Sequence, residues 1–237
     1  MPIIVFASSK GGAGKTTAAV ILTCELARQG AKKGLNIALI DADPNQHSAA
    51  WAKKEGCPEN IHLIENATED SILDAIEAAE SKAAFVVVDL EGVASSAVIG
   101  AVSRADLVII PCQPSQNDAK EAAKTIKTIQ YSARVSGRKI PFAVLFTRLS
   151  GAIVTKTGKH LASEFDGAGI DLFKCSLIDR EAFKSIFSYG GTVNNLEGST
   201  KREQDSINKA ADNAVIFAEE VKRKLKASID QRRATNG

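Results

Sequence analysis

The sequence predicts an α/β fold, a predominantly parallel twisted sheet with helices on both faces. Short apolar runs alternate along the chain with longer amphipathic segments, which is the pattern of strand–helix–strand units. The apolar runs are continuous and rich in β-branched residues, as in Phe85–Val88, and strands of that kind are buried on both faces. A chain of 237 residues, 44% of them hydrophobic, is large enough for one such domain, so we expect residues 1–237 to form it.

Seven short apolar runs are expected to be strands, joined by right-handed crossovers. The fifth is ended by Pro111, because proline cannot donate to a β-ladder. The predicted strands are Ile3–Ala7, Asn36–Ile40, Ile61–Ile64, Phe85–Val88, Leu107–Ile110, Phe142–Thr147 and Ile170–Phe173.

Four longer segments have the pattern of helices. In Asp70–Ser81 the apolar residues recur on one face, and Thr68 is placed to cap the start. The predicted helices are Thr16–Gly30, Asp70–Ser81, Ala119–Val135 and a terminal stretch over Glu203–Ile229, continuous or broken. The polar segment Thr192–Lys201 is expected to link a core of about residues 2–196 to the terminal stretch, and Gln231–Gly237 is expected to fray.

Composition excludes several classes of protein. No apolar run has the length of a membrane span, and the first residues lack the basic region and cleavage site of a signal peptide, so a cytoplasmic location is expected. The four cysteines have no metal-ligand spacing, and the three histidines are isolated. A net charge of +2 is too small to indicate nucleic acid by itself.

The most informative segment is Ser8–Thr17, SSKGGAGKTT, which follows a predicted strand and opens a predicted helix. Glycines let the backbone approach an anion closely, and their N–H groups and the helix N-terminus direct positive charge at phosphates. Lys15 can reach the β- and γ-phosphate oxygens, and the Thr16 hydroxyl is placed for Mg²⁺. The expected ATP-binding residues of this loop are Lys10, Gly11, Gly12, Ala13, Gly14, Lys15, Thr16 and Thr17.

Two positions separate this loop from the ordinary motif: Ser9 stands where glycine is usual, and Lys10 is additional. The pattern Lys-Gly-Gly-x-Gly-Lys-Thr-Thr resembles the deviant Walker A motif of the ParA/MinD superfamily of ATPases. The resemblance implies an ATP-dependent homodimer in which Lys10 reaches the partner subunit's ATP. It also implies slow hydrolysis, with Lys10 and Lys15 acting in catalysis.

Acidic residues follow two of the predicted strands. In a parallel sheet, ligands bind beyond the carboxyl ends of the strands, so these acids are expected to face the ligand. Asp41 and Asp43 resemble the family's switch I, which implies that Asp43 positions the attacking water and Asp41 belongs to the Mg²⁺ shell; the alternative is two helix-capping acids. Asp89 ends the run FVVVD, a Walker B layout that holds Mg²⁺. Leu90 and Glu91 depart from the family's pattern, which has proline shortly after the aspartate, and Glu91 is a candidate for the water network.

The resemblance continues more weakly to about residue 196. The segments around Thr147-Arg148 and Leu177–Phe183 resemble those on the family's adenine side, which implies adenine contacts by Thr147, Arg148 and Asp179. Asp179 occupies the place of the family's usual proline.

A stripe of basic residues marks the predicted helix 119–135. Spacings of four, three and seven place Lys120, Lys124, Lys127 and Arg134 on one face, opposite Ala122, Ala123, Ile126 and Ile129. Such a stripe suits contacts to DNA phosphates without sequence preference, although it is also typical of a solvated face. The terminal stretch is basic too, and it is expected to pack on the body, with DNA binding or a membrane-surface role as alternatives.

The resemblance therefore implies a ParA-type ATPase that binds non-specific DNA in plasmid or chromosome partition. It implies a ParB-like or centromere-binding partner that stimulates hydrolysis. An accessory ATPase of conjugative or T-DNA-type transfer is the main alternative, and a MinD-like membrane-positioning ATPase is the alternative of another class. A metabolic ligase on the same fold is disfavoured by Lys10, and an iron–sulfur carrier by the lack of a cysteine pair.

Overall fold

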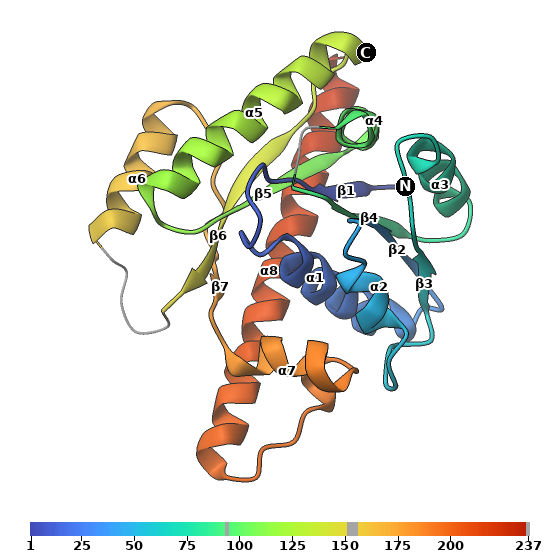
Figure 1. The fold of residues 1–237 in the computed structure, drawn as a ribbon, viewed down its shortest axis with the longest axis vertical. Helices are drawn as coiled ribbons and strands as arrows, with labels where there is room; N and C mark the ends of the chain where they lie inside the picture. Colours follow the sequence, from blue (N-terminus) through green and yellow to red (C-terminus); the bar gives the residue numbers. More distant parts are fainter. Residues whose placement is uncertain (93–94, 151–155, 236–237) are drawn as a thin grey trace.

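The central sheet has the strand order β3-β2-β4-β1-β5-β6-β7, and every pairing is parallel (Figure 1). The computed structural model describes residues 1–92, 95–150 and 156–235. The strands are β1 Ile3–Phe6, β2 Ile37–Ala42, β3 Ile61–Ile64, β4 Phe85–Leu90, β5 Leu107–Cys112, β6 Phe142–Leu149 and β7 Leu177–Ile178. The predicted α/β fold with a parallel sheet is therefore confirmed.

Helices cover both faces of the sheet, and each face has its own hydrophobic core because side chains alternate along the strands. Ile4 and Phe6 point to one face, whereas Ile3 and Val5 point to the other. The first face is covered by α1 Lys15–Ala31, α2 His47–Ala52, α7 Glu181–Tyr189 and α8 Lys201–Thr235. The second face is covered by α3 Ile72–Glu80, α4 Ser96–Arg104, α5 Gln116–Ser136 and α6 Lys156–Gly167.

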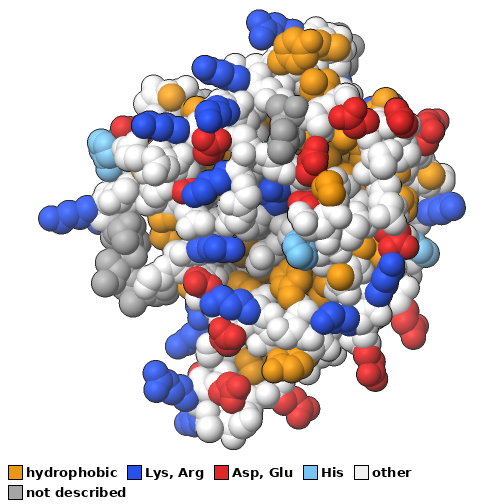
Figure 2. Space-filling view, in the orientation of Figure 1, with side chains coloured by type: hydrophobic (Ala, Val, Ile, Leu, Met, Phe, Trp, Pro, Cys, Tyr) orange, Lys and Arg blue, Asp and Glu red, His pale blue; other side chains and the backbone are white. Residues whose placement is uncertain are grey.

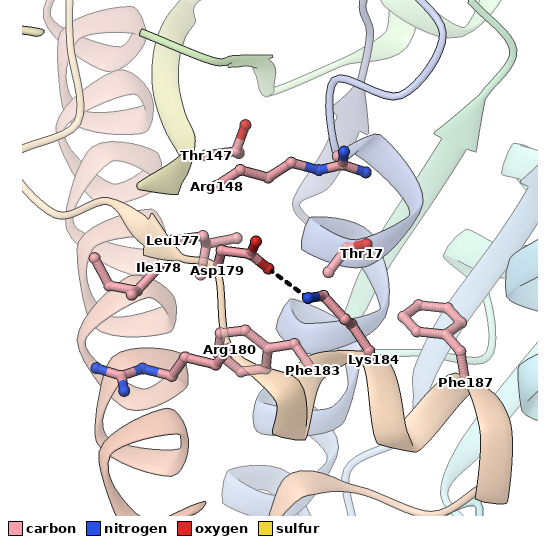
Figure 3. A pocket seen from close by; sticks show the side chains of 11 residues that line it. Thr17, Thr147, Arg148, Leu177, Ile178, Asp179, Arg180, Phe183, Lys184 and Phe187 are labelled. Carbon is pink, nitrogen blue, oxygen red and sulfur yellow. Dashed lines mark ion pairs between the residues drawn. The ribbon is translucent and has the colours of Figure 1, made fainter. Parts of the chain in front are cut away.

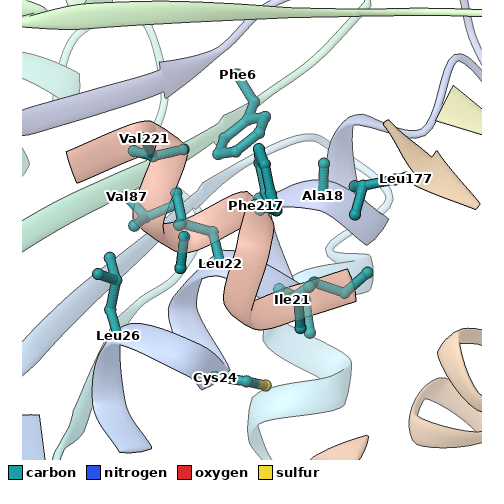
Figure 4. Packing of buried hydrophobic residues seen from close by; sticks show 14 of the residues in the cluster. Phe6, Ala18, Ile21, Leu22, Cys24, Leu26, Val87, Leu177, Phe217 and Val221 are labelled. Atoms are coloured by element: carbon teal, nitrogen blue, oxygen red, sulfur yellow. The ribbon is translucent and has the colours of Figure 1, made fainter. Parts of the chain in front are cut away.

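The long helix α8 packs along α1 and the sheet through its apolar residues (Figure 4). Phe217, Val221 and Leu225 are buried, and the Phe217 ring lies 5.8 Å from that of Phe173. The helix is continuous, so the break allowed for in the terminal stretch does not occur. The frayed tail expected from residue 231 is partly wrong, because α8 continues to Thr235; residues 236–237 lie outside the described part.

The predicted strand at Ile170–Phe173 is wrong. This segment makes an isolated β-bridge, between Val144 and Leu172. The last strand of the sheet lies further along the chain, at Leu177–Ile178. The reason lies in α8: the Glu220 carboxylate accepts hydrogen bonds from the backbone N–H groups of Lys174 and Cys175, both at 2.8 Å, and so diverts the chain that follows. Helices α4, α6 and α7 were not predicted, and the linker 192–201 contains a short 3₁₀ helix, Val193–Asn195.

The strand order places a crevice at the carboxyl edge of the sheet. From β1 the chain first passes to one side, to β2 and β3, and after β4 it continues on the other side with β5. Loops that leave β1 and its neighbours therefore diverge, and such reversal points bind ligands in open α/β sheets. Among the described residues, no helix combines the length and the apolarity needed to cross a membrane.

Candidate functional site

The phosphate loop joins β1 to α1 at this edge. Gly12 and Gly14 have φ angles of 77° and 97°, a region in which a side chain would be strained. Gly14 is the N-cap residue of α1, and no side chain caps this helix end, so its first N–H groups are available to an anion. Lys15 is only 6% exposed, and its burial lowers the pKa of its ammonium group, while the acids Asp89, Asp43 and Glu91 oppose that shift.

A cavity of about 590 Å³ lies over the loop and brings together residues from four segments of the chain. It is lined by Ser9, Gly11, Gly12, Gly14, Lys15, Thr16, Thr17, Asp43, Pro44, Asn45, His47, Glu91, Gly92 and Arg148. The expected residues Gly11, Gly12, Gly14, Lys15, Thr16, Thr17 and Asp43 lie here together with the candidate Glu91, whereas Ala13 and Lys10 do not line the cavity. His47, the first residue of α2, was not expected, since a single histidine carries no signal in the sequence.

A second cavity, of about 370 Å³, adjoins the first and shares Gly14, Thr17 and Arg148 with it. The three residues expected on the adenine side, Thr147, Arg148 and Asp179, all line this second cavity (Figure 3). Helix α7 forms the opposite wall with Phe183, Lys184 and Phe187, which the sequence did not single out as contacts.

Two polar side chains of this second cavity, Thr147 and Asp179, already have partners within the chain. The Thr147 hydroxyl donates to the Ala13 carbonyl at 2.8 Å, so it supports the phosphate loop directly. Asp179 forms an ion pair with Lys184 at 3.2 Å, drawn as the dashed line in Figure 3. Arg148 has a φ of 54°, which costs a non-glycine residue energy and is typical of functional sites.

Asp89 lies at the end of β4, completely buried, and neither of its oxygens has a hydrogen-bond partner among the described residues. Burial raises the pKa of its carboxyl group from 3.8 to about 7, and the nearby Asp41 and Asp43 add to this. The Thr16 hydroxyl and the Lys15 ammonium are close enough to lower the pKa in part. No partner has ordinary hydrogen-bond geometry, so the carboxylate is unpaired among the described residues.

We expect Asp89→Asn to stabilise the nucleotide-free protein above pH 7. In the unfolded chain the acid ionises near pH 4, but in the fold it keeps its proton until about pH 7, so the free energy of unfolding falls between these values. The amide variant avoids this loss, which is on the order of 4 kcal/mol for a pKa raised from 3.8 to about 7. Thermal unfolding in EDTA at pH 4.5 and pH 8 measures it, with Asp74→Asn as an exposed control. A variant less stable than the wild type at pH 8 would contradict the expectation.

The two acids at the carboxyl end of β2, Asp41 within the strand and Asp43 just beyond it, have different surroundings. Both oxygens of Asp41 are used within the chain, one accepting from the Asp43 N–H at 3.0 Å and the other from the Ala49 N–H at 2.8 Å. Asp41 is fully buried and thereby fixes the loop and the start of α2; its place in a Mg²⁺ shell stays a prediction. Asp43 lines the phosphate cavity, and its Oδ1 accepts from the backbone and side chain of Asn45, both at 2.9 Å.

Lys10 does not line the phosphate cavity. Its ammonium group lies 2.8 Å from the carboxylate of Asp118, at the start of α5. Asp118 was not predicted as a site residue, because the predicted helix begins at residue 119, whereas the helix in the structure begins at Gln116 with Ser115 as its cap. The spacing Ser115-x-x-Asp118 before an apolar pattern is a capping signal that could have located it.

The basic stripe of α5 is exposed, as expected. Lys120, Lys124, Lys127 and Arg134 are all exposed, and Figure 2 shows basic side chains gathered along this helix. Tyr131 and Val135, 51% and 65% exposed, lie among them. Ala122, Ile126 and Ile129 are buried on the opposite side, but Ala123, which was expected there, is exposed.

Comparisons with known proteins decide the family. The VirC1 protein family matches residues 1–227. The chain belongs to this family. Protein ParA of Rhizobium radiobacter is 38% identical over 97% of this chain and all of its own length, and Protein virC1 of Rhizobium rhizogenes is 28% identical over 80% of this chain and 82% of its own.

The VirC1-family relationship places the chain among the ParA/MinD ATPases, as its phosphate loop indicated. Its fold agrees with this. The solved ATP complex of a Cyanothece McdA variant superposes with a TM-score of 0.70 over 93% of this chain and 96% of that one, at 16% identity.

Proposed function

We propose that this VirC1-family ATPase binds ATP and Mg²⁺ at the phosphate loop, closes into a homodimer through Lys10, and holds non-specific DNA while ATP is bound. Hydrolysis then releases the DNA. The observation that carries the proposal is the phosphate cavity, where Lys15, Thr16 and Asp43 meet within reach of the unpaired carboxylate of Asp89.

The residues fit a magnesium ion. An unpaired, fully buried carboxylate is costly unless a cation or a hydrogen bond compensates it, and Mg²⁺ prefers oxygen ligands. Thr16 and Asp89 would hold the ion, which supplies charge neutralisation at the β- and γ-phosphates. An ion there also favours the ionised form of Asp89 and so removes the energetic cost of burying it.

The chain's own residues would do the rest by positioning. The N–H groups of the loop and the Lys15 ammonium bind and orient the phosphates. Asp43, held by Asn45, would orient the attacking water, and Glu91 lies in the same cavity. Lys10 would bring a further positive charge from the partner subunit.

The structure favours DNA over a membrane as the surface that is bound. The exposed basic face of α5 suits phosphates spaced along a duplex. In α8, by contrast, Phe217, Val221 and Leu225 are buried against the body, so they are not free to enter a lipid surface.

Partition of a plasmid or chromosome is the biological role that we favour, because the ParA protein of Rhizobium radiobacter is 38% identical along its whole length. A ParB-like or centromere-binding protein would stimulate hydrolysis, in a cytoplasmic setting. The match to the VirC1 protein family favours a second candidate, an accessory ATPase in DNA transfer. Both candidates use the same ATP-gated DNA binding.

The test is retention of the protein on non-specific duplex DNA with ATP, with ADP and without nucleotide, at about 50 mM and about 200 mM salt. Retention with ATP alone, lost at the higher salt, is expected. Equal retention in all three nucleotide states would overturn the gating, and no retention in any state would overturn the DNA-binding function.

Replacing three lysines of the α5 face, Lys120, Lys124 and Lys127, by glutamine is expected to weaken ATP-dependent DNA binding and to reduce its salt dependence. Loss of three phosphate contacts lowers the slope of log K against log salt by about 2 to 3. A matched triple change at the exposed Lys32, Lys33 and Lys201 is the control. An unchanged slope in the α5 variant, with ATP hydrolysis intact, would locate the DNA site elsewhere.

A further inference from the structure

In the free subunit, Lys10 is bound to its own chain. Its ammonium group donates to Oδ2 of Asp118 at 2.8 Å, and the Ser115 hydroxyl donates to the same oxygen at 2.5 Å. Asp118 is 5% exposed, whereas the Lys10 side chain is 39% exposed. Although burial opposes it, the hydrogen bonds from Lys10 and Ser115 hold the pKa of Asp118 below its usual value, so the pair is ionic.

The backbone beside Lys10 is fastened to the same helix. The Ser9 N–H donates to the Thr125 hydroxyl at 3.0 Å, and the Ser9 hydroxyl lies 2.8 Å from both the backbone oxygen and the carboxylate of Glu121. Ser9 is the residue that replaces the usual glycine of the motif, and its side chain makes this attachment possible. With the backbone held, the flexible side chain of Lys10 is the part that can move.

While it is bound to Asp118, Lys10 does not line the phosphate cavity of its own subunit, and a carboxylate already neutralises its charge. We propose that Asp118 stores Lys10 within its own subunit, so that closing the dimer requires Lys10 to exchange this carboxylate for the phosphates of the partner's ATP. Asp118 is then a positioning residue that sets how much ATP is needed for closure. This inference rests on the proposed ATP-dependent dimer.

The direction of the effect follows from burial. Releasing Lys10 leaves the carboxylate of Asp118 buried without its cation, and only Ser115 still donates to Oδ2. Its other oxygen, Oδ1, has no hydrogen-bond partner of ordinary geometry among the described residues, and the nearby backbone N–H of Gln113 offsets the loss of the cation only in part. Subunits in which Lys10 is released from Asp118 are therefore a minority. If ATP closes the dimer only in those subunits, the apparent affinity for ATP in dimer closure is reduced in proportion to the fraction of subunits with Lys10 released.

The test uses Asp118→Asn, which removes the charge that holds Lys10. The expected result is a dimer that forms at about 5- to 10-fold lower ATP concentration than the wild type requires, measured by light scattering with a slowly hydrolysed ATP analogue. At the same time the nucleotide-free variant should unfold at a lower temperature, because it has lost the ion pair. A merely structural role would weaken both properties, so the opposite signs identify storage of Lys10.

Three further variants complete the experiment. Asp118→Glu keeps the charge and should return the ATP requirement toward that of the wild type. Asp171→Asn removes an ion pair with Lys224 on another surface and should leave the ATP requirement for dimer formation unchanged. Ser115→Ala removes the other donor to Oδ2, so Asp118 should hold Lys10 more tightly and the ATP requirement should rise about 2- to 5-fold; this variant serves if Asp118→Asn does not fold.

An Asp118→Asn dimer that needs as much ATP as the wild type, or more, overturns the inference while leaving the proposed function standing. A Ser115→Ala variant that needs less ATP than the wild type to dimerise also overturns the inference and leaves the proposed function standing. If neither the wild type nor Asp118→Asn dimerises with saturating nucleotide, the dimer itself is wrong and both proposals fall. If only the variant dimerises, storage by Asp118 is supported in its strongest form.

Discussion

Replacing Lys15 by alanine is expected to abolish ATP binding, weakening it by more than about 100-fold. Lys15 is the first residue of α1 and lines the phosphate cavity with its side chain almost fully buried. A charge in such a place acts strongly on a phosphate because little water screens it. Removing it would leave Asp43 and Asp89 near the phosphates without the cation that interacts with both of them.

Isothermal titration with ATP and Mg²⁺ measures this effect. Lys33→Ala is a matched control, because Lys33 is exposed just beyond the other end of α1. The control should bind ATP like the wild type. ATP binding by Lys15→Ala within a factor of three of the wild type would mean that the cavity over the loop is not the phosphate site.

Much of the fold could be predicted because its signals are local. Runs such as Phe85–Val88 are apolar without interruption, and such runs become the central strands of a parallel sheet. The segment Ile170–Phe173 is mostly apolar but contains Asp171, and it does not extend into a strand. Glu220, about fifty residues later, accepts hydrogen bonds from the backbone N–H groups that follow it. An acceptor so distant in the sequence cannot be recognised from the local pattern of apolar residues. Helix α4 is as long as the predicted α3 but was missed, because its buried residues include valines, which are also typical of strands.

The candidate site divides in the same way. The phosphate loop is one contiguous motif, and Asp43 and Asp89 follow strands whose carboxyl ends must meet, so their proximity could be argued from topology. The partners of Ser9 and Lys10 could not, because Glu121 and Asp118 lie more than a hundred residues away. Spacing alone does not bring a loop onto one particular helix.

Helix α5 links the two parts of the proposed mechanism. Residues in its first turns accept hydrogen bonds from Ser9 and Lys10, and its exposed face bears the basic stripe. Glu121 belongs to both parts, since it accepts from Ser9 and also pairs with Lys124 at 2.7 Å. A change in how the loop rests on α5 can therefore alter the charges presented to DNA, and by linkage DNA would influence nucleotide binding to the same extent.

Asp43→Ala is expected to lower ATP hydrolysis by about 100-fold or more while preserving ATP binding and the ATP-bound dimer. Asp43 lines the phosphate cavity and is held by Asn45, but Lys15 and the loop N–H groups that bind phosphate are independent of it. The variant should therefore accumulate as a DNA-bound dimer in ATP that no longer dissociates with time. Lys10→Ala should also lose hydrolysis, but because it cannot close the dimer it should fail to stay on DNA.

Comparing these two variants separates the roles of their side chains. Phosphate release measures hydrolysis, and the time course of DNA retention after ATP is added measures how long the dimer lasts. Asp74→Ala, at an exposed acid on α3, is the control for removal of a carboxylate. If Asp43→Ala hydrolyses ATP at the wild-type rate, the water is oriented by another group, and Glu91 is the carboxylate of the same cavity to test next. If Lys10→Ala persists on DNA as long as Asp43→Ala does, Lys10 is not the group that closes the dimer, and its ion pair with Asp118 is structural.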